Sequence, residues 1–99
     1  NIEYAYSDFF ASWDNSETVC PADTWVCSDG ELGGGTLVDI PVYNRVGCDG
    51  ALESTNYAWV SNQNPGNPNG VISRFVASTN DLTKCASQKV WCCRETVIP

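Results

Sequence analysis

Six cysteines carry the clearest chemistry in this sequence of 99 residues. They could act as metal ligands, as reactive thiols or as disulfides. Zinc sites place paired ligands two to four residues apart and often use histidine, but the chain contains neither histidine nor a C-x-x-C motif. We therefore expect three disulfides in an exported protein. The cysteines are Cys20, Cys27, Cys48, Cys85, Cys92 and Cys93.

Cys92 and Cys93 are adjacent in KVWCCRE, and an extended strand predicts how they pair. Neighbouring side chains of a strand point to opposite faces of the sheet. Each cysteine should therefore reach a different partner, one on each side. A bridge between the two themselves would be strained. Six cysteines allow fifteen pairings, so the connectivity stays open at this point.

Catalytic groups are scarce. Because the chain has no histidine, Ser-His-Asp and Cys-His catalysis are excluded in their usual forms. Glycosidases use paired carboxylates, which Asp29 with Glu31, or Asp14 with Glu17, could supply. With ten acids in residues 1–53, however, such pairs are inevitable, and a domain this small has little room for a deep cleft. We expect no enzymatic activity, no catalytic residue, no cofactor and no bound metal.

The charge is acidic and uneven along the chain. Twelve acidic residues and five basic residues give a net charge of −7. Residues 1–53 hold ten of the acids and one of the basic residues. Because such a surface repels phosphate groups, we expect no nucleic-acid partner and no insertion into an anionic membrane. The charge serves either solubility or the recognition of a basic partner.

Four tryptophans are many for a chain of this size, and they are the first candidates for binding. Core packing is the alternative, because tryptophan is a large apolar residue with one donor to satisfy. We expect three of the four in the core. Trp25, which lies between two cysteines in PADTWVC, is the best candidate for exposure, and Trp59 is the second. An exposed tryptophan beside asparagine can stack on a sugar and hydrogen-bond to it.

The segment SNQNPGNPNG, residues 61–70, contains four asparagines, two prolines and two glycines. Since nothing in it can fill a core, we expect an exposed loop between strands around Trp59 and Val71. It is either a long hairpin connection or a recognition loop. The candidate binding residues in it are Asn62, Asn64, Asn67 and Asn69.

The hydrophobic pattern predicts mostly strands. Residues alternate in NIEYAYS (1–7), LVDIPVY (37–43) and STNYAWV (54–60), and β-branched runs occupy GVISRFVAS (70–78) and QKVWCCRETVI (88–98). Gly- and Pro-rich turns separate these runs, which favours a mainly β fold. We expect a small antiparallel β-sandwich of Greek-key type that is cross-linked by disulfides. Residues 1–99 should form a single domain. We expect at most one or two short helices, in residues 7–17 and 81–88.

Two stretches that start 39 residues apart share a pattern. YAYSDFFA begins at Tyr4 and has Phe9 five positions later, and YNRVGCDG begins at Tyr43 and has Gly50 seven positions later. This resembles the aromatic, aromatic, glycine pattern that opens each Greek key of the βγ-crystallin family. The resemblance implies two Greek keys packed as a sandwich. Small secreted members of that family include antimicrobial toxins and fungal secreted proteins.

The segment NDLTKC, residues 80–85, resembles the calcium signature of the same family, which ends in two hydroxyl residues. Lys84 and Cys85 stand where those hydroxyl residues would complete the site. A lysine beside the site would also repel calcium. The segment therefore gives no reason to expect a bound metal.

Size, acidity and cysteine content resemble those of small cysteine-rich secreted proteins of fungi. The chain begins with asparagine and has no apolar run of about 20 residues, so we expect a processed, extracellular protein. The expected function is that of a non-enzymatic interaction protein, of effector, toxin or antimicrobial type, which acts through surface loops on a protein or glycan outside the cell. A carbohydrate-binding module and an inhibitor of a secreted hydrolase are the alternatives. The target and the oligomeric state stay open.

Overall fold

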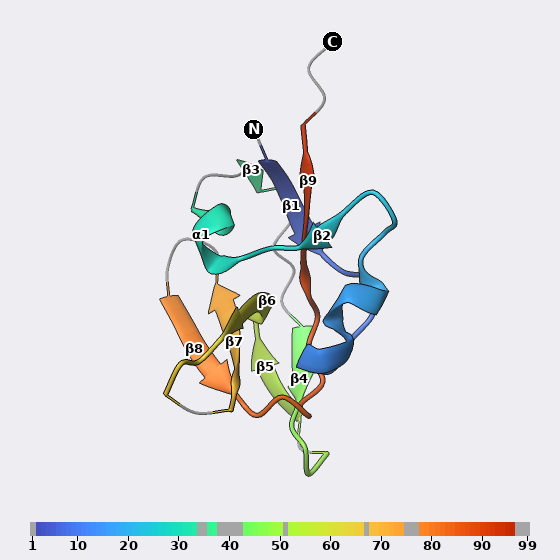
Figure 1. The fold of residues 1–99 in the computed structure, drawn as a ribbon. Helices are drawn as coiled ribbons and strands as arrows, with labels where there is room; N and C mark the ends of the chain where they lie inside the picture. Colours follow the sequence, from blue (N-terminus) through green and yellow to red (C-terminus); the bar gives the residue numbers. More distant parts are fainter. Residues whose placement is uncertain are drawn as a thin grey trace.

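The computed structural model describes residues 2–33, 36–37, 43–50, 52–66, 68–74 and 78–96 (Figure 1). The strands are β1 (Ile2–Tyr6), β2 (Trp25–Val26), β3 (Thr36–Leu37), β4 (Tyr43–Val46), β5 (Leu52–Thr55), β6 (Ala58–Gln63), β7 (Gly70–Arg74), β8 (Ser78–Leu82) and β9 (Trp91–Glu95). The helices are the 3₁₀ helix η1 (Trp13–Val19) and α1 (Asp29–Leu32). The predicted class is confirmed: a small, mainly β fold with three disulfides and two short helices.

The described strands form three sheets. The largest has the order β2-β9-β1-β3, a second has the order β6-β7-β8, and β4 pairs with β5. Among the pairings between the named strands, β1 with β3 is parallel and the others are antiparallel. An isolated bridge between Trp59 and Val90 is also parallel. The first and last strands, β1 and β9, lie side by side (Figure 1), with Ile2 opposite Glu95 and Tyr6 opposite Trp91. Residues from the two ends of the chain therefore build one surface.

The core consists of two buried clusters, which lie on opposite faces of β6 and β9. One buried cluster joins Tyr4 and Cys93 of the four-stranded sheet to Ala58 and Val60 of β6. A second cluster contains Trp59 of β6 together with Ile72, Ala86, Val90 and Cys92. Successive residues of β6 and of β9 thus enter different clusters. Backbone hydrogen bonds from the Trp59 N–H to the Lys89 carbonyl (2.9 Å) and from the Ser61 N–H to the Cys27 carbonyl (2.8 Å) connect the two sheets.

Trp91 is the centre of the first cluster and is fully buried. Its ring stacks on Tyr6, with centroids 4.2 Å apart, and meets the edge of Tyr4 at 5.5 Å. Its Nε1 donates a 2.9 Å hydrogen bond to the carbonyl of Ser73 in β7. Because Trp91 belongs to β9, this one side chain links both sheets by packing and by a hydrogen bond.

One local prediction is wrong, and two others are confirmed in part. The helix expected over residues 81–88 is wrong, because β8 runs to Leu82 and pairs along its length with β7. Long-range strand pairing overrides the weak helix signals there. The strand expected over residues 37–43 is seen at its two ends, in β3 and β4, and residues 38–42 lie outside the described part. The helical turn expected within residues 7–17 is confirmed in part by η1, which starts at Trp13.

Gly70, the first residue of β7, leaves no room for a side chain. A Cβ there would lie 2.4 Å from Trp13 Cδ1 and 2.9 Å from Trp59 Cζ3. Hydrogen bonds hold both rings: Trp13 Nε1 bonds to the carbonyls of Val60 and Asn62, and Trp59 Nε1 to that of Ala11. The rings can therefore move aside only by breaking these bonds.

We expect Gly70→Ala to lower the free energy of unfolding by about 1–3 kcal/mol, the usual cost of overpacking. Urea unfolding measures this loss. Gly30→Ala is the matched control, because no described atom lies within 4 Å of the added Cβ. It should stabilise α1 by up to about 1 kcal/mol, since alanine favours a helix over glycine. Equal midpoints for the two variants would show that the tryptophan rings yield freely.

Candidate functional site

Three disulfides take up all six cysteines, as predicted. The pairs are Cys20–Cys92, Cys27–Cys93 and Cys48–Cys85. The adjacent Cys92 and Cys93 have different partners and belong to different core clusters, because successive residues of β9 face opposite sides of the sheet. The opposite-face prediction is confirmed. The tertiary structure also shows which cysteines are bonded to each other, a question that the sequence left open.

Trp25 lies on a strand that disulfides hold on both sides. β2 pairs with β9, with Trp25 opposite Cys93, and the flanking Cys20 and Cys27 are both cross-linked to β9. The side chain is 38% exposed, which confirms the predicted exposure. Its Nε1 donates a 2.9 Å hydrogen bond to Glu31 Oε2. The backbone and the edge of the indole are therefore both fixed, while much of the ring meets solvent.

Glu31 connects Trp25 to the start of α1. Its other carboxylate oxygen accepts a 2.8 Å hydrogen bond from the Ser28 backbone N–H, and the Glu31 N–H donates to Ser28 Oγ at 3.2 Å. These two bonds form a capping box at the N-terminus of α1. Burial raises the pKa of Glu31, but the hydrogen bonds from Ser28 and Trp25 outweigh it, so that the pKa lies below its ordinary value.

We expect the Glu31 carboxyl to titrate below its ordinary pKa, and NMR of the carboxyl carbon during an acid titration measures this. A pKa that folding lowers contributes stability above the unfolded-state pKa and loses it as the pH falls through the folded-state pKa. Unfolding free energies of the wild type should therefore decline more steeply in acid than those of Glu31→Gln. Glu17→Gln, on the exposed side of η1, should keep the steeper decline. Parallel curves for the wild type and Glu31→Gln would contradict the prediction.

An open hollow of about 560 Å³ lies beside Trp25, and we call it the Trp25 hollow. Its lining residues are Glu3, Asp23, Trp25, Arg94, Glu95 and Thr96. Arg94 is the one cation among them, and it pairs with Glu3: Nη2 and Nε lie 2.8 and 2.9 Å from Glu3 Oε2. Three carboxylates and one guanidinium thus surround an exposed indole, and the balance of charge is negative.

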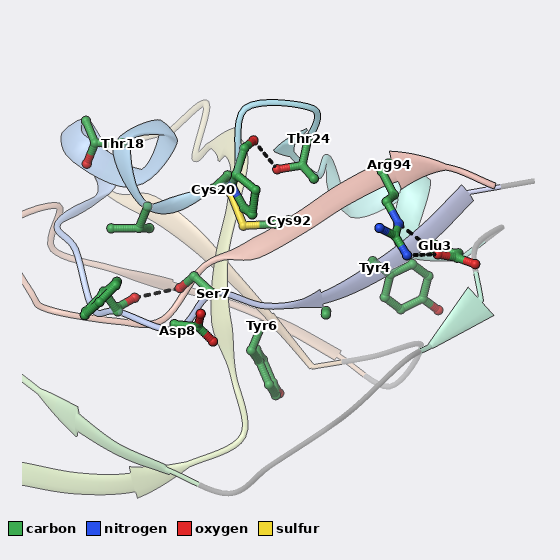
Figure 2. Close-up of a pocket in the computed structure, with 14 residues that line it drawn as sticks. Glu3, Tyr4, Tyr6, Ser7, Asp8, Thr18, Cys20, Thr24, Cys92 and Arg94 are labelled. Atoms are coloured by element: carbon green, nitrogen blue, oxygen red, sulfur yellow. Dashed lines mark hydrogen bonds and ion pairs between the residues drawn. A yellow bond between two sulfur atoms is a disulfide. The ribbon is translucent and has the colours of Figure 1, made fainter. Parts of the chain in front are cut away.

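A second depression of about 520 Å³ runs along β1, and we call it the β1 groove (Figure 2). The Glu3–Arg94 pair stands at one end, and Ser7 and Asp8 lie toward the other. In Figure 2 the Cys20–Cys92 disulfide lies on one side of the β1–β9 pair, while Tyr4 and Tyr6 point to the opposite side. The outward residues of β1 and the disulfide thus form the floor of the groove.

Phe9, which also lines the β1 groove, is 71% exposed. The Ser7 hydroxyl fixes the chain just before it, because it donates to the Phe9 carbonyl at 2.6 Å and accepts from the Val90 N–H at 2.9 Å. Sequence reasoning missed this residue as a binding candidate. The signal was present in SDFFAS, where two adjacent aromatics break the alternation of the preceding strand.

Trp59, the second candidate for an exposed binding residue, is fully buried, so the expected exposure is wrong. Its Nε1 donates to the Ala11 carbonyl at 2.9 Å inside the second core cluster. Trp91 is buried as well, and Trp13 is half-buried with Lys84 Nζ 4.3 Å from its ring centroid. Two tryptophans are therefore in the core and a third packs against it, which leaves Trp25 as the exposed one.

The asparagine segment is a hairpin connection that is shorter than expected, because β6 extends to Gln63 and β7 begins at Gly70. Asn64 Nδ2 and Asn69 Nδ2 donate to the same Asp81 oxygen of β8, at 3.1 and 3.2 Å. Asn62 Oδ1 accepts from the Asp29 N–H at 2.7 Å, at the start of α1. Asn67 lies outside the described residues. The described asparagines thus tie the hairpin to its neighbours, which favours a structural role over recognition.

The described part of the chain contains no group of three or more His, Cys, Asp or Glu residues arranged to hold a metal ion. Asp81 of the calcium-like segment lies in β8, where two asparagine amides bind it. None of the described helices is long and apolar enough to cross a bilayer.

Comparison of the chain with protein-family models, with curated proteins and with solved structures finds no match. The resemblance to the βγ-crystallin family stays a prediction from the residues that carry it. The function is therefore inferred from the surface that the structure presents.

Proposed function

We propose that this protein is a secreted, non-enzymatic interaction protein of effector, toxin or antimicrobial type, whose contact surface is centred on Trp25. A rigidly held, exposed tryptophan carries this proposal. Trp25 is 38% exposed, its strand is cross-linked to β9 on both sides, and its indole N–H is anchored to Glu31. Tryptophan is prominent among the residues that dominate binding energy at protein interfaces. A residue already fixed in place loses little entropy on binding.

The disulfides support a location outside the cell. Disulfides persist in oxidising compartments and are rare in the cytosol. Here three of them cross-link a domain of 99 residues, a size at which the hydrophobic core alone supplies limited stability. An interaction protein of this kind works by presenting a surface, so the cross-links serve its function by keeping that surface in one shape.

Peptide selection tests the proposal although the natural partner is unidentified. The oxidised protein is immobilised and a random 12-residue peptide library displayed on phage is selected against it. Enriched peptides are then synthesised and their dissociation constants measured with the wild type and with Trp25→Ala. We expect at least tenfold weaker binding to Trp25→Ala, and wild-type binding to Phe10→Ala, which removes another exposed aromatic. A failure to enrich any peptide, or equal binding to Trp25→Ala, would contradict the proposal.

A carbohydrate-binding module is the second candidate, and the surroundings of Trp25 favour it. The Trp25 hollow combines an aromatic face with hydrogen-bonding groups on Asp23, Arg94, Glu95 and Thr96. Stacking on the ring together with such groups is how sugars are commonly held. Titration with chitin, glucan and mannan fragments, followed by tryptophan fluorescence, separates the two functions. A saturable shift that disappears in Trp25→Ala would place a glycan at this surface instead of a protein.

A further inference from the structure

We infer that the partner segment recognised by this surface is an extended basic peptide. A lysine or arginine side chain of the peptide enters the Trp25 hollow, and the adjoining residues lie along the β1 groove. The inference rests on the proposed function and names the chemistry of its partner.

The charge of the Trp25 hollow favours a cation. Arg94, the one cation in its lining, is already paired with Glu3. Asp23 and Glu95, which are both exposed, remain as uncompensated carboxylates among the lining residues. A cation that enters the hollow gains attraction from both carboxylates and from the face of the indole. The net charge of −7 on the chain also attracts a basic segment from a distance.

A cation–π contact between a lysine and an indole is already present in this protein, at Trp13. Lys84 Nζ lies 4.3 Å from the centroid of the Trp13 ring and donates to Gln63 Oε1 at 3.0 Å. The Trp13 indole N–H is meanwhile held by backbone carbonyls. Trp25 has the same arrangement at its edge, where Glu31 holds the indole N–H. Beside the Trp25 ring, however, lies a carboxylate-lined hollow where a lysine from a partner can take the corresponding position.

The β1 groove gives the rest of the peptide a path. Glu3 and Arg94 line both the Trp25 hollow and the β1 groove, so the two adjoin at this ion pair. From Glu3 to Tyr6 the groove follows β1 over about 10 Å, the length of three residue steps in a strand, and it continues past Ser7 and Asp8 to Phe9. Ala5 and the Cys20–Cys92 disulfide make its floor apolar, and the exposed Phe9 offers a second aromatic contact at the far end.

The sheet determines how a peptide can bind here. β1 pairs with β9 on one side and with β3 on the other. At Glu3 and Tyr4, where β3 pairs, both edges of β1 are engaged, so a peptide cannot add there as a further strand. We place it across the face of the sheet, where it is recognised through side chains. The basic side chain at Trp25 then sets the position of the peptide.

Composition of the selected peptides is the first test. Peptides whose binding depends on Trp25 should be enriched in lysine or arginine relative to the unselected library. Replacing that basic residue by norleucine should weaken binding to the wild type at least tenfold. Peptides that depend on Trp25 but carry no basic residue would overturn the inference while leaving the proposed function intact. Binding that is indifferent to Trp25 would instead overturn the proposed function.

Charge variants give the second test. Asp23→Asn combined with Glu95→Gln should weaken binding of the basic peptides at least tenfold, and norleucine substitution should then cause little further loss. Asp14→Asn combined with Asp49→Asn changes the net charge equally at exposed residues outside the hollow and should bind as the wild type does. Equal effects of the two double variants would show a general attraction to the acidic protein, which overturns the assignment to the Trp25 hollow.

Two neighbouring phenylalanines test the β1 groove. Phe9 lines the groove and is 71% exposed, whereas Phe10 is 38% exposed and lies outside the lining. We expect Phe9→Ala to weaken the selected basic peptides at least threefold and Phe10→Ala to leave their binding unchanged. If both variants bind as the wild type does, the path along the β1 groove is wrong.

Discussion

Replacing Cys27 and Cys93 together by alanine is expected to lower the free energy of unfolding by about 2–4 kcal/mol, the usual range for a disulfide. The two residues lie 66 positions apart, but Cys20–Cys92 still closes a loop of nearly the same size in this variant, so the loss of loop entropy is confined to the small ring between the two disulfides. Both cysteines are fully buried in the first core cluster, so packing is lost as well. Since small domains are stable by about 5–15 kcal/mol, this is a large fraction of the total. Urea unfolding of the oxidised proteins at neutral pH measures the difference.

The Cys48–Cys85 disulfide provides the control. It joins residues 37 positions apart, and both of its cysteines are exposed. Because Cys20–Cys92 already constrains the chain around Cys27 and Cys93, the entropic contribution of Cys48–Cys85 is at least as large as that of Cys27–Cys93. Its exposed sulfur atoms, however, contribute little packing. We expect the packing difference to dominate, so that replacing this pair by alanine costs less than replacing Cys27 and Cys93. An equal or larger loss would show that burial of the sulfur atoms does not set the contribution of each cross-link.

Trp91→Ala is expected to lower the free energy of unfolding by about 3–5 kcal/mol, the range for a buried tryptophan. The ring is fully buried, stacks on Tyr6, contacts the edge of Tyr4 and donates to the Ser73 carbonyl. Its removal leaves a cavity in the first core cluster and breaks the hydrogen bond to the Ser73 carbonyl. Urea unfolding followed by circular dichroism measures the loss, because the signal does not depend on tryptophan number.

Two variants separate the parts of the Trp91 effect. Trp91→Phe keeps a ring in the core but loses the hydrogen bond to the Ser73 carbonyl, so it should cost about 0.5–1.5 kcal/mol for that bond in addition to a small packing loss. Trp25→Ala removes a tryptophan that is 38% exposed and should cost far less than Trp91→Ala. Similar losses for Trp91→Ala and Trp25→Ala would contradict the placement of Trp91 at the centre of the core.

These two predictions bear on function because the stabilising elements also hold the proposed contact surface. β9 carries the disulfide partners of both cysteines that flank Trp25. It also carries Arg94, whose ion pair with Glu3 stands between the Trp25 hollow and the β1 groove. A loss of order in β9 should therefore weaken peptide binding as well as stability. Denaturation and binding can be compared directly in the same disulfide variants.

Local patterns predicted several parts of the structure. Alternation in NIEYAYS predicted β1, because side chains at every second position face the same side of a strand. The same rule predicted that Cys92 and Cys93 would have different partners. The flanking cysteines marked Trp25 as a residue on the periphery of the core. Each of these predictions needed only the neighbouring residues of the chain.

Other features escaped prediction because they depend on contacts between distant residues. Trp59 and Trp25 are the same residue type, and only the packing of β6 against the second core cluster buries Trp59. The asparagines of residues 61–70 look alike in sequence, yet Asn64 and Asn69 bind Asp81 while Asn62 binds the start of α1. In residues 81–88 the pairing of β8 with β7 overrides a weak local helix propensity.

The sequence by itself determined the class of the protein: an acidic, cysteine-rich chain of short alternating segments must form a small cross-linked β fold, since periodicity and cysteine content are local properties. The tertiary structure decided which cysteines pair, which tryptophan meets solvent and where the surface is hollow. The Trp25 hollow and the β1 groove combine residues from β1, β9 and the segment before β2. These residues come together only when β1 pairs with β9, and no local sequence pattern predicts that long-range pairing.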